Sequence, residues 1–172
     1  YTFNAQYQQK PLIQESSMIK KSWLKEYKDK IEFENVFLSF DTAIKAGINN
    51  DPTVCTVWGE YKNNYYLFDV VREWLEYPEL KKISIDLIKK YGPTAVLIED
   101  KASGQSLIQD LKNELRQNII PIKITKDKIT RFASVTPFFE SGRIFILENT
   151  EWIVDYKNEL LSFPNSLHDD QV

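Results

Sequence analysis

The sequence predicts an α/β domain, in which a central sheet carries helices on both faces. Several short apolar runs lack polar alternation, as is typical of strands covered on both faces. After residue 77, such runs alternate with segments whose apolar residues have helical spacing. The resulting order is three strands, then a helix and a strand three times over, then a last helix, with an antiparallel start. At 172 residues the chain is long enough for one domain with a buried core.

The first half of the chain predicts the antiparallel part. Residues 1–30 are polar, and the spacing of Trp23, Leu24 and Tyr27 predicts a short amphipathic helix that packs onto the domain without joining its sheet. We expect a first strand at 36–40. Two β-branched and aromatic runs at 53–61 and 64–74, joined by a turn at 62–64, predict a hairpin.

The second half predicts alternating helices and strands. The first of these helices carries Leu80, Ile83, Leu87 and Tyr91 on one face and stops at Gly92-Pro93. The helix that begins at 127 is expected to run at least to Pro137, and one strand is interrupted by Pro121. The expected ranges are helices at 77–92, 103–117, 127–142 and 151–163, and strands at 94–98, 119–124 and 143–147.

Composition and motif content exclude several classes of protein. The longest apolar runs fall well short of the roughly 20 residues of a membrane span. Cys55 is the only cysteine and His168 the only histidine, so an internal disulfide and a Cys/His zinc site are excluded. The chain has no GxxxxGK[ST] loop and is not expected to hydrolyse ATP by itself. The net charge of −3 argues against a DNA-coating protein more than against an enzyme with a local basic patch.

Acidic residues stand at the ends of apolar stretches. They are Asp41, the pair Glu99-Asp100 and the pair Asp169-Asp170. Separately, each has an ordinary interpretation as a turn former, a loop residue or a charge at a helix start. Jointly, at strand ends of an α/β sheet, clustered carboxylates need a cation, and three of them suit Mg²⁺ or Mn²⁺. Two such ions about 3.5–4 Å apart can activate a water and stabilise a leaving oxygen in phosphodiester cleavage.

Five stretches, in order along the chain, resemble the nuclease domain at the C-terminal end of terminase large subunits, the motors that package viral DNA. FLSFDTAIKAG is similar to the first acidic motif of that family, VLIEDKASGQSL to the second and NSLHDDQV to the third. DKITRFASVTPFFESGRIFI resembles the family's basic helix with the Gly-Arg and strand that follow. YTFNAQYQQKPL resembles the segment that leaves the preceding ATPase domain.

The resemblance implies a ribonuclease H-like fold, with a mixed sheet whose first three strands are antiparallel. It also implies a metal-dependent endonuclease that cleaves double-stranded DNA during packaging in the host cytoplasm, with two Mg²⁺ or Mn²⁺ ions. Residues 1–30 would be the connector from an ATPase domain, and 31–172 a nuclease domain truncated at its C-terminal end. The small terminase subunit and the portal are the other partners that the resemblance implies.

Carried over by position, Asp41 would be the central, bridging metal ligand. In the second motif we favour Glu99, because it shares a strand face with Ala95 and Leu97 while Asp100 points the other way; Asp100 stays an alternative. In the third motif either Asp169 or Asp170 supplies the last ligand, and the sequence does not choose between them. His168, beside them, is expected to polarise a water, contact a phosphate or cap a helix.

Basic residues near these motifs are candidates for binding the DNA backbone, a contact that is independent of base sequence and sensitive to salt. Lys128 and Arg131 are three residues apart on one helix face and match the family pattern. A solvated charged face is the alternative for each position. The other candidates are Lys101, Lys123, Lys126 and Arg143, with Lys45 a weaker one.

Two other functions remain open at this point. A Holliday-junction resolvase or transposase of the same fold would prefer branched DNA to linear DNA. A non-catalytic module that docks the motor to the portal would neither gain stability from divalent metals nor cleave plasmid DNA. The polar first 30 residues are the feature most compatible with the docking module.

Overall fold

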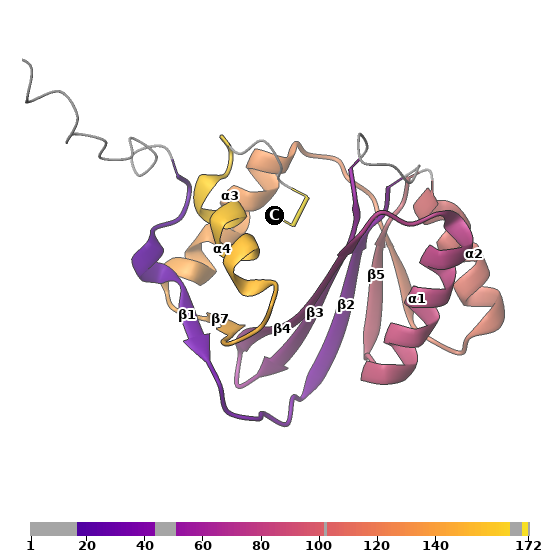
Figure 1. Ribbon diagram of the computed structural model, residues 1–172, viewed down its shortest axis with the longest axis horizontal. Helices are drawn as coiled ribbons and strands as arrows, with labels where there is room; N and C mark the ends of the chain where they lie inside the picture. Colours follow the sequence, from indigo (N-terminus) through magenta and orange to yellow (C-terminus); the bar gives the residue numbers. More distant parts are fainter. Residues whose placement is uncertain (1–16, 44–50, 102, 166–169, 172) are drawn as a thin grey trace, which may run out of the picture.

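The computed structural model describes residues 17–43, 51–101, 103–165, 170 and 171. Over these residues the chain forms one sheet of seven strands, with helices on both sides of it (Figure 1). The spatial order of the strands is β1-β7-β4-β3-β2-β5-β6. Their bounds are β1 Lys25–Tyr27, β2 Asn35–Asp41, β3 Thr53–Tyr61, β4 Asn64–Glu73, β5 Ala95–Glu99, β6 Ile119–Ile122 and β7 Ile144–Leu147.

Strand pairing confirms the mixed sheet that the sequence predicts. Strands β2, β3 and β4 pair in antiparallel fashion. Strand β5 pairs in parallel with β2, β6 with β5, and β7 with β4. The helical segments expected after residue 77 are present as α1 Tyr77–Tyr91, α2 Ser103–Glu114, α3 Lys128–Glu140 and α4 Ile153–Ser162.

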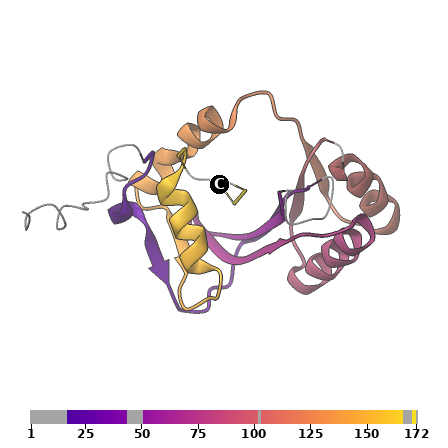
Figure 2. The same cartoon turned by 45° about the horizontal axis from the view of Figure 1, so that its top comes forward.

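The helices divide between the two faces of the sheet (Figures 1 and 2). Helices α1 and α2 pack against one face, where Leu38, Val57 and Ile98 are fully buried. Helices α3 and α4 pack against the other, where Leu67 and Ile146 are fully buried. Because neighbouring residues of a strand point to opposite faces, β3 and β4 contribute side chains to both cores. The core residues of β2 and β5 lie on the α1–α2 side, and the opposite side of these two strands lines a cavity under α3 and α4.

The segment from 20 to 30 differs from its prediction. It forms a short 3-10 turn at Lys21–Trp23 and then strand β1, which pairs in parallel with β7 at the edge of the sheet. The expected helix is therefore wrong, and so is the expectation that this segment stays outside the sheet. The ring of Tyr27 meets that of Tyr66 edge-on, with centroids 5.1 Å apart. Strand β1 covers a free edge that β7 would otherwise leave. The role of residues 1–30 as a connector stays a prediction.

Two prolines lie inside regular elements without ending them. Pro121 is in β6, an edge strand, where a missing N–H removes no bond from the interior of the sheet. Helix α3 continues through Pro137 to Glu140. Pro137 cannot donate to the Ala133 carbonyl one turn earlier, and the Thr136 hydroxyl donates to that carbonyl instead, at 2.9 Å. This replacement bond lets the helix extend past the proline.

Candidate active site

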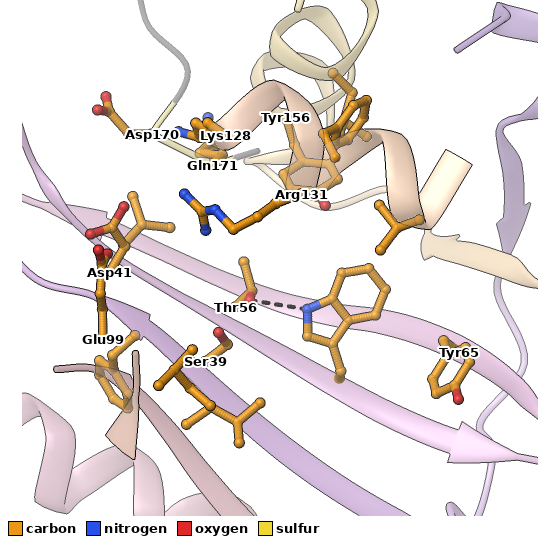
Figure 3. A pocket seen from close by; sticks show the side chains of 18 of the residues that line it. Ser39, Asp41, Thr56, Tyr65, Glu99, Lys128, Arg131, Tyr156, Asp170 and Gln171 are labelled. Carbon is orange, nitrogen blue, oxygen red and sulfur yellow. Dashed lines mark hydrogen bonds between the residues drawn. The ribbon is translucent and has the colours of Figure 1, made fainter. Parts of the chain in front are cut away.

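Asp41 and Glu99 come together at the carboxyl ends of two neighbouring parallel strands. Strands β2 and β5 pair up to Phe40 and Ile98, and each acid is the next residue on its strand. Both acids point to the face that carries α3 and α4, and Figure 3 shows their carboxyl groups next to each other. Carboxyl ends of central strands are where sites form in open α/β sheets.

Glu99 and Asp100 differ in their position relative to the cavity, and the choice of Glu99 as the metal ligand stays a prediction. Leu97 and Glu99 both line the cavity in front of Asp41, whereas Asp100 does not. The backbone N–H of Asp100 donates to the Ile122 carbonyl at 2.9 Å and so ties this residue to β6. The alternation of side chains along β5 is the reason: a residue one step further along a strand faces the opposite side.

The acid pair lies in a cavity of about 580 Å³ between the sheet and helices α3 and α4. Its acidic end holds Asp41, Glu99 and Asp170, and two cations from α3, Lys128 and Arg131, also line it. The indole N–H of Trp58 donates to the Thr56 hydroxyl at 3.0 Å on the sheet side (Figure 3). The apolar part of the wall is formed by Val54, Leu97, Ile122, Ile124, Phe132, Val135, Phe138, Phe139, Ile144 and Leu160.

Burial and mutual repulsion change the ionisation of the acid pair. Burial in the cavity wall, and next the negative charge of Glu99, raise the pKa of Asp41 to about 6. Lys101 and Lys128 oppose this rise without cancelling it. The ammonium group of Lys101 lies 2.7 Å from the carboxylate of Glu99, which is largely buried. The raised pKa means that the surroundings stabilise the ionised form of Asp41 less well than water does, and a cation bound beside the carboxylate would supply the missing stabilisation.

The third predicted acid lies at the same cavity but has another partner. Asp170 pairs with the guanidinium of Arg72 on β4 at 3.1 Å. Within the described ranges, no three Asp, Glu, His or Cys side chains are close enough to hold one ion. Asp169 and His168 lie outside the described residues, so the choice within the third motif is not tested. The donors that do meet, two carboxylates, are hard oxygen ligands that fit Mg²⁺ or Mn²⁺.

The basic candidates fall into two groups. Lys128 and Arg131 open α3 and extend toward the acid pair (Figure 3). Asp127 fixes the start of that helix, since its carboxylate accepts from the Thr130 N–H at 2.8 Å. Lys101 is at the acid pair through its contact with Glu99. Lys123 and Lys126 are exposed on the segment before α3 and do not line the cavity, and Lys45 lies outside the described residues.

Arg143 is not brought to the acid pair. Its guanidinium donates to the Asn63 carbonyl at 2.8 Å and stands over the Phe138 ring, 4.9 Å from its centroid. Asn63 belongs to the β3–β4 turn, whereas Asp41 pairs with Val54 at the other end of β3. From Val54 to Tyr61, where β3 ends, the strand advances by seven steps, roughly 23 Å. Arg143 thus ties this turn to α3 and lies outside the cavity.

Two residues that contact the third motif were not among the predicted site residues. Arg72, in β4, contacts Asp170, and Glu159, in α4, accepts hydrogen bonds from Gln171. A signal for Glu159 exists in the sequence: it follows Tyr156 by three residues and precedes Phe163 by four, so it shares their apolar face. A carboxylate there is buried and needs donors. No comparable sequence signal indicates the partner of Arg72.

Gly104 gives a testable link between α2 and the acid pair. A Cβ at this position would lie 2.0 Å from the Glu99 carbonyl oxygen, a backbone atom that cannot move aside. We expect Gly104→Ala to lower the free energy of unfolding by about 3 kcal/mol, near the upper end for overpacking. Urea unfolding measures this loss. The exposed Ser106→Ala, on the same helix, is the control, and equal stability of both variants would contradict the packing.

Comparisons with known proteins agree with the fold. The family model of the terminase RNaseH-like domain matches residues 38–172. The large terminase of a thermophilic bacteriophage has a TM-score of 0.66 at 16% identity, over 87% of this chain and 36% of that protein. The P22 large terminase nuclease domain has a TM-score of 0.61 at 12% identity, over 85% and 79%. The human cytomegalovirus terminase nuclease domain, soaked with Mn and bound to an inhibitor, has 0.60 at 11% identity, over 90% of each chain.

The structural neighbours show the fold of the chain, and the family model shows its family. Curated protein sequences gave no match. The chain spans about a third of the thermophilic bacteriophage protein. Among the described helices of this chain, none is long and apolar enough to cross a membrane. At such low identity the solved structures show a shared fold, and they confirm the predicted ribonuclease H-like class. The family model covers most of the chain, including the three acidic motifs. The chain belongs to the family of terminase RNaseH-like domains.

Proposed function

We propose that this domain is the nuclease of a viral DNA-packaging terminase and that it cleaves double-stranded DNA with divalent metal ions. The observation that carries the proposal is the Asp41–Glu99 pair, held at two strand ends inside a cavity with cations on its other wall. Membership of the terminase family supports the packaging context. The Mn-soaked human cytomegalovirus domain of the same fold supports a divalent metal.

The reaction is hydrolysis of a phosphodiester. A water oxygen bonds to phosphorus, the bond from phosphorus to one ester oxygen breaks, and the released oxygen takes a proton. Asp41 and Glu99, with Asp170 or Asp169, would hold Mg²⁺ or Mn²⁺ in the cavity. Such ions supply Lewis acidity that polarises the phosphate and lowers the pKa of a water. The residues of the chain contribute negative charge that fixes the ions and a wall that limits access of bulk water.

Lys128 and Arg131 are proposed to hold the DNA backbone over the acid pair. Both side chains project from the first turns of α3 into the cavity, on the side facing Asp41. Cations placed so contact phosphates and read no base sequence. Lys101, which contacts Glu99, and the exposed Lys126, two residues before Lys128 in the sequence, are further candidates for phosphate contacts. The isolated domain is therefore expected to have little preference for base sequence. In the full protein, the ATPase, the small subunit and the portal would direct the nuclease to its DNA in the host cytoplasm.

Incubation with supercoiled plasmid tests this function. With Mn²⁺ the chain is expected to nick and linearise the plasmid, and a chelator is expected to stop the reaction. A linear duplex and a four-way junction of equal length should be cut at rates within about threefold of each other. A strong preference for the junction would favour a resolvase. Intact plasmid at every Mn²⁺ concentration would favour a docking module without catalysis.

The basic residues of α3 make a second prediction. Replacing Lys128 or Arg131 by Gln is expected to weaken binding to a short duplex by roughly threefold to tenfold at low salt. Each replacement should also reduce the slope of log affinity against log salt by about one, because one phosphate contact is lost. Fluorescence anisotropy at several salt concentrations measures both quantities. Arg116→Gln, an exposed position beyond α2, is the control. An unchanged salt slope in the two α3 variants would refute the contact.

A further inference from the structure

Gln171 is held by a buried carboxylate of α4. Its backbone N–H donates to one oxygen of Glu159, and its side-chain amide donates to the other at 2.7 Å. Both residues are only 7% exposed. A buried carboxylate is costly unless it accepts hydrogen bonds, so Glu159 and Gln171 depend on each other. The contact fixes both the backbone and the side chain of the residue that follows Asp170.

Asp170 itself is held from the opposite side, by the sheet. The guanidinium of Arg72 lies 3.1 Å from one of its carboxylate oxygens. Arg72 stands opposite Val54 on β3, and Val54 stands opposite Asp41 on β2, so the three residues form one row across the sheet. The guanidinium also stands over the Trp74 ring, 5.7 Å from its centroid. A stacked guanidinium has little freedom to turn, which makes it a fixed point for the carboxylate.

We propose that Glu159 and Arg72 form a two-point clamp on Asp170 and Gln171 that positions Asp170 at the rim of the metal-binding cavity. The two contacts come from different elements, α4 and β4, and act on adjacent residues, so together they fix the place and the direction of the Asp170 side chain. Arg72 contacts one carboxylate oxygen of Asp170, and the other oxygen is the one that would contact a divalent ion in the cavity. Glu159 and Arg72 are positioning residues: they touch the residues that carry Asp170, not the reacting atoms.

Preorganisation gives the clamp its effect. A carboxylate that must be ordered when an ion binds adds the entropy of that ordering to the cost of binding. Residues that orient metal ligands typically change metal affinity by roughly tenfold to a hundredfold when replaced. This inference rests on the proposed function, since it takes Asp170 as a metal ligand. The hydrogen bonds of the clamp exist without metal and can be measured without it.

The test compares three variants of the chain that each remove a contact, and a fourth that conserves the charge of Arg72, with matched controls. Glu159→Gln replaces an acceptor oxygen by an amide that cannot accept, and Arg72→Gln removes the cation beside Asp170. Gln171→Ala keeps the backbone N–H and removes only the side-chain contact, so it is the mildest change. The controls remove one charge of the same sign at an exposed position. Asp155→Asn on α4 is the control for Glu159→Gln, and Arg116→Gln beyond α2 is the control for Arg72→Gln.

Two measurements are made, one of them without metal. In the metal-free chain, NMR amide exchange should show the Gln171 N–H protected, with at least a tenfold loss of protection in Glu159→Gln and none in Asp155→Asn. Calorimetric titration with Mn²⁺, without DNA, should show roughly tenfold weaker binding in Glu159→Gln and Arg72→Gln. Gln171→Ala should lose less, and the controls nothing. Arg72→Lys, which keeps a cation beside Asp170, should recover part of the loss.

The outcomes separate the clamp from the proposed function. An unprotected Gln171 N–H in the metal-free chain would overturn the clamp, whatever the enzyme does. Normal Mn²⁺ binding in Glu159→Gln, or tighter binding in Arg72→Gln, would overturn its positioning role while the nuclease proposal stood. A protected N–H in a chain that binds no Mn²⁺ and cuts no plasmid would overturn the proposed function, and with it the role of the clamp toward metal.

Discussion

Replacing Glu99 by Gln is expected to slow plasmid cleavage at least about a hundredfold, while Asp100→Asn leaves the rate within about threefold. The two acids are neighbours in sequence and differ in the face of β5 to which they point. Glu99 lies beside Asp41 in the cavity, and Asp100 does not line it. Because a metal ligand contributes directly to ion binding and catalysis, losing Glu99 costs far more than losing an acid outside the cavity. Asp41→Ala should cost at least as much as Glu99→Gln.

Rates of plasmid nicking under single-turnover conditions in Mn²⁺ measure this difference. Asp86→Asn, an exposed acid on α1 at the opposite face of the sheet, is the control for the loss of one charge. Equal losses in Glu99→Gln and Asp100→Asn would show that strand alternation does not select the ligand. Full activity of Asp41→Ala would end the assignment of this pair as a metal site.

Removing the charge of Asp41 is expected to stabilise the metal-free domain. The pKa of Asp41 is about 6 in the folded chain and about 3.8 when unperturbed. A raised pKa means that the folded state favours the protonated acid, so the stability from this group is present below about pH 4 and is lost as the pH rises through 6. At neutral pH the loss is at most about 3 kcal/mol. Asp41→Asn should recover much of it and raise the melting temperature by roughly 5 °C.

Thermal unfolding with chelator at pH 4 and pH 7.5 measures this effect. The variant and the parent chain should melt together at the lower pH and separate at the higher one, with Asp86→Asn following the parent at both. On addition of Mn²⁺ at pH 7.5 the order should reverse, because the ion compensates the charge only where Asp41 is present. A variant less stable than the parent in chelator at neutral pH would contradict the cost of burying the Asp41 charge beside Glu99.

Local patterns in the sequence predict the fold well for helices and strands whose structure follows from their own residues. The apolar runs at β2 and β5, the hairpin of β3 and β4, and the helical spacing of α1 and α2 all correspond to observed elements. The position of Glu99 follows from the same alternation, since it needs only β5. Two strand ends that carry acids are therefore enough to predict that Asp41 and Glu99 meet.

Features that depend on distant partners were not predictable from such patterns. The spacing of Trp23, Leu24 and Tyr27 favours a helix, but residues 25–27 form a strand because they pair with the free edge of β7. Arg143 is close to the basic helix in sequence, but its side chain donates to the Asn63 carbonyl at the end of the sheet opposite to Asp41. Long-range pairing overrides local spacing in both cases, as tertiary contacts commonly override propensity.

The most direct test of the central claim is the location of Mn²⁺ in crystals of the domain, found from its anomalous scattering. We expect a strong peak between the carboxylates of Asp41 and Glu99 in the parent chain, and its loss in Asp41→Asn crystals soaked in the same way. A peak that persists in the variant, or Mn²⁺ bound elsewhere while this pair stays without an ion, would contradict the account.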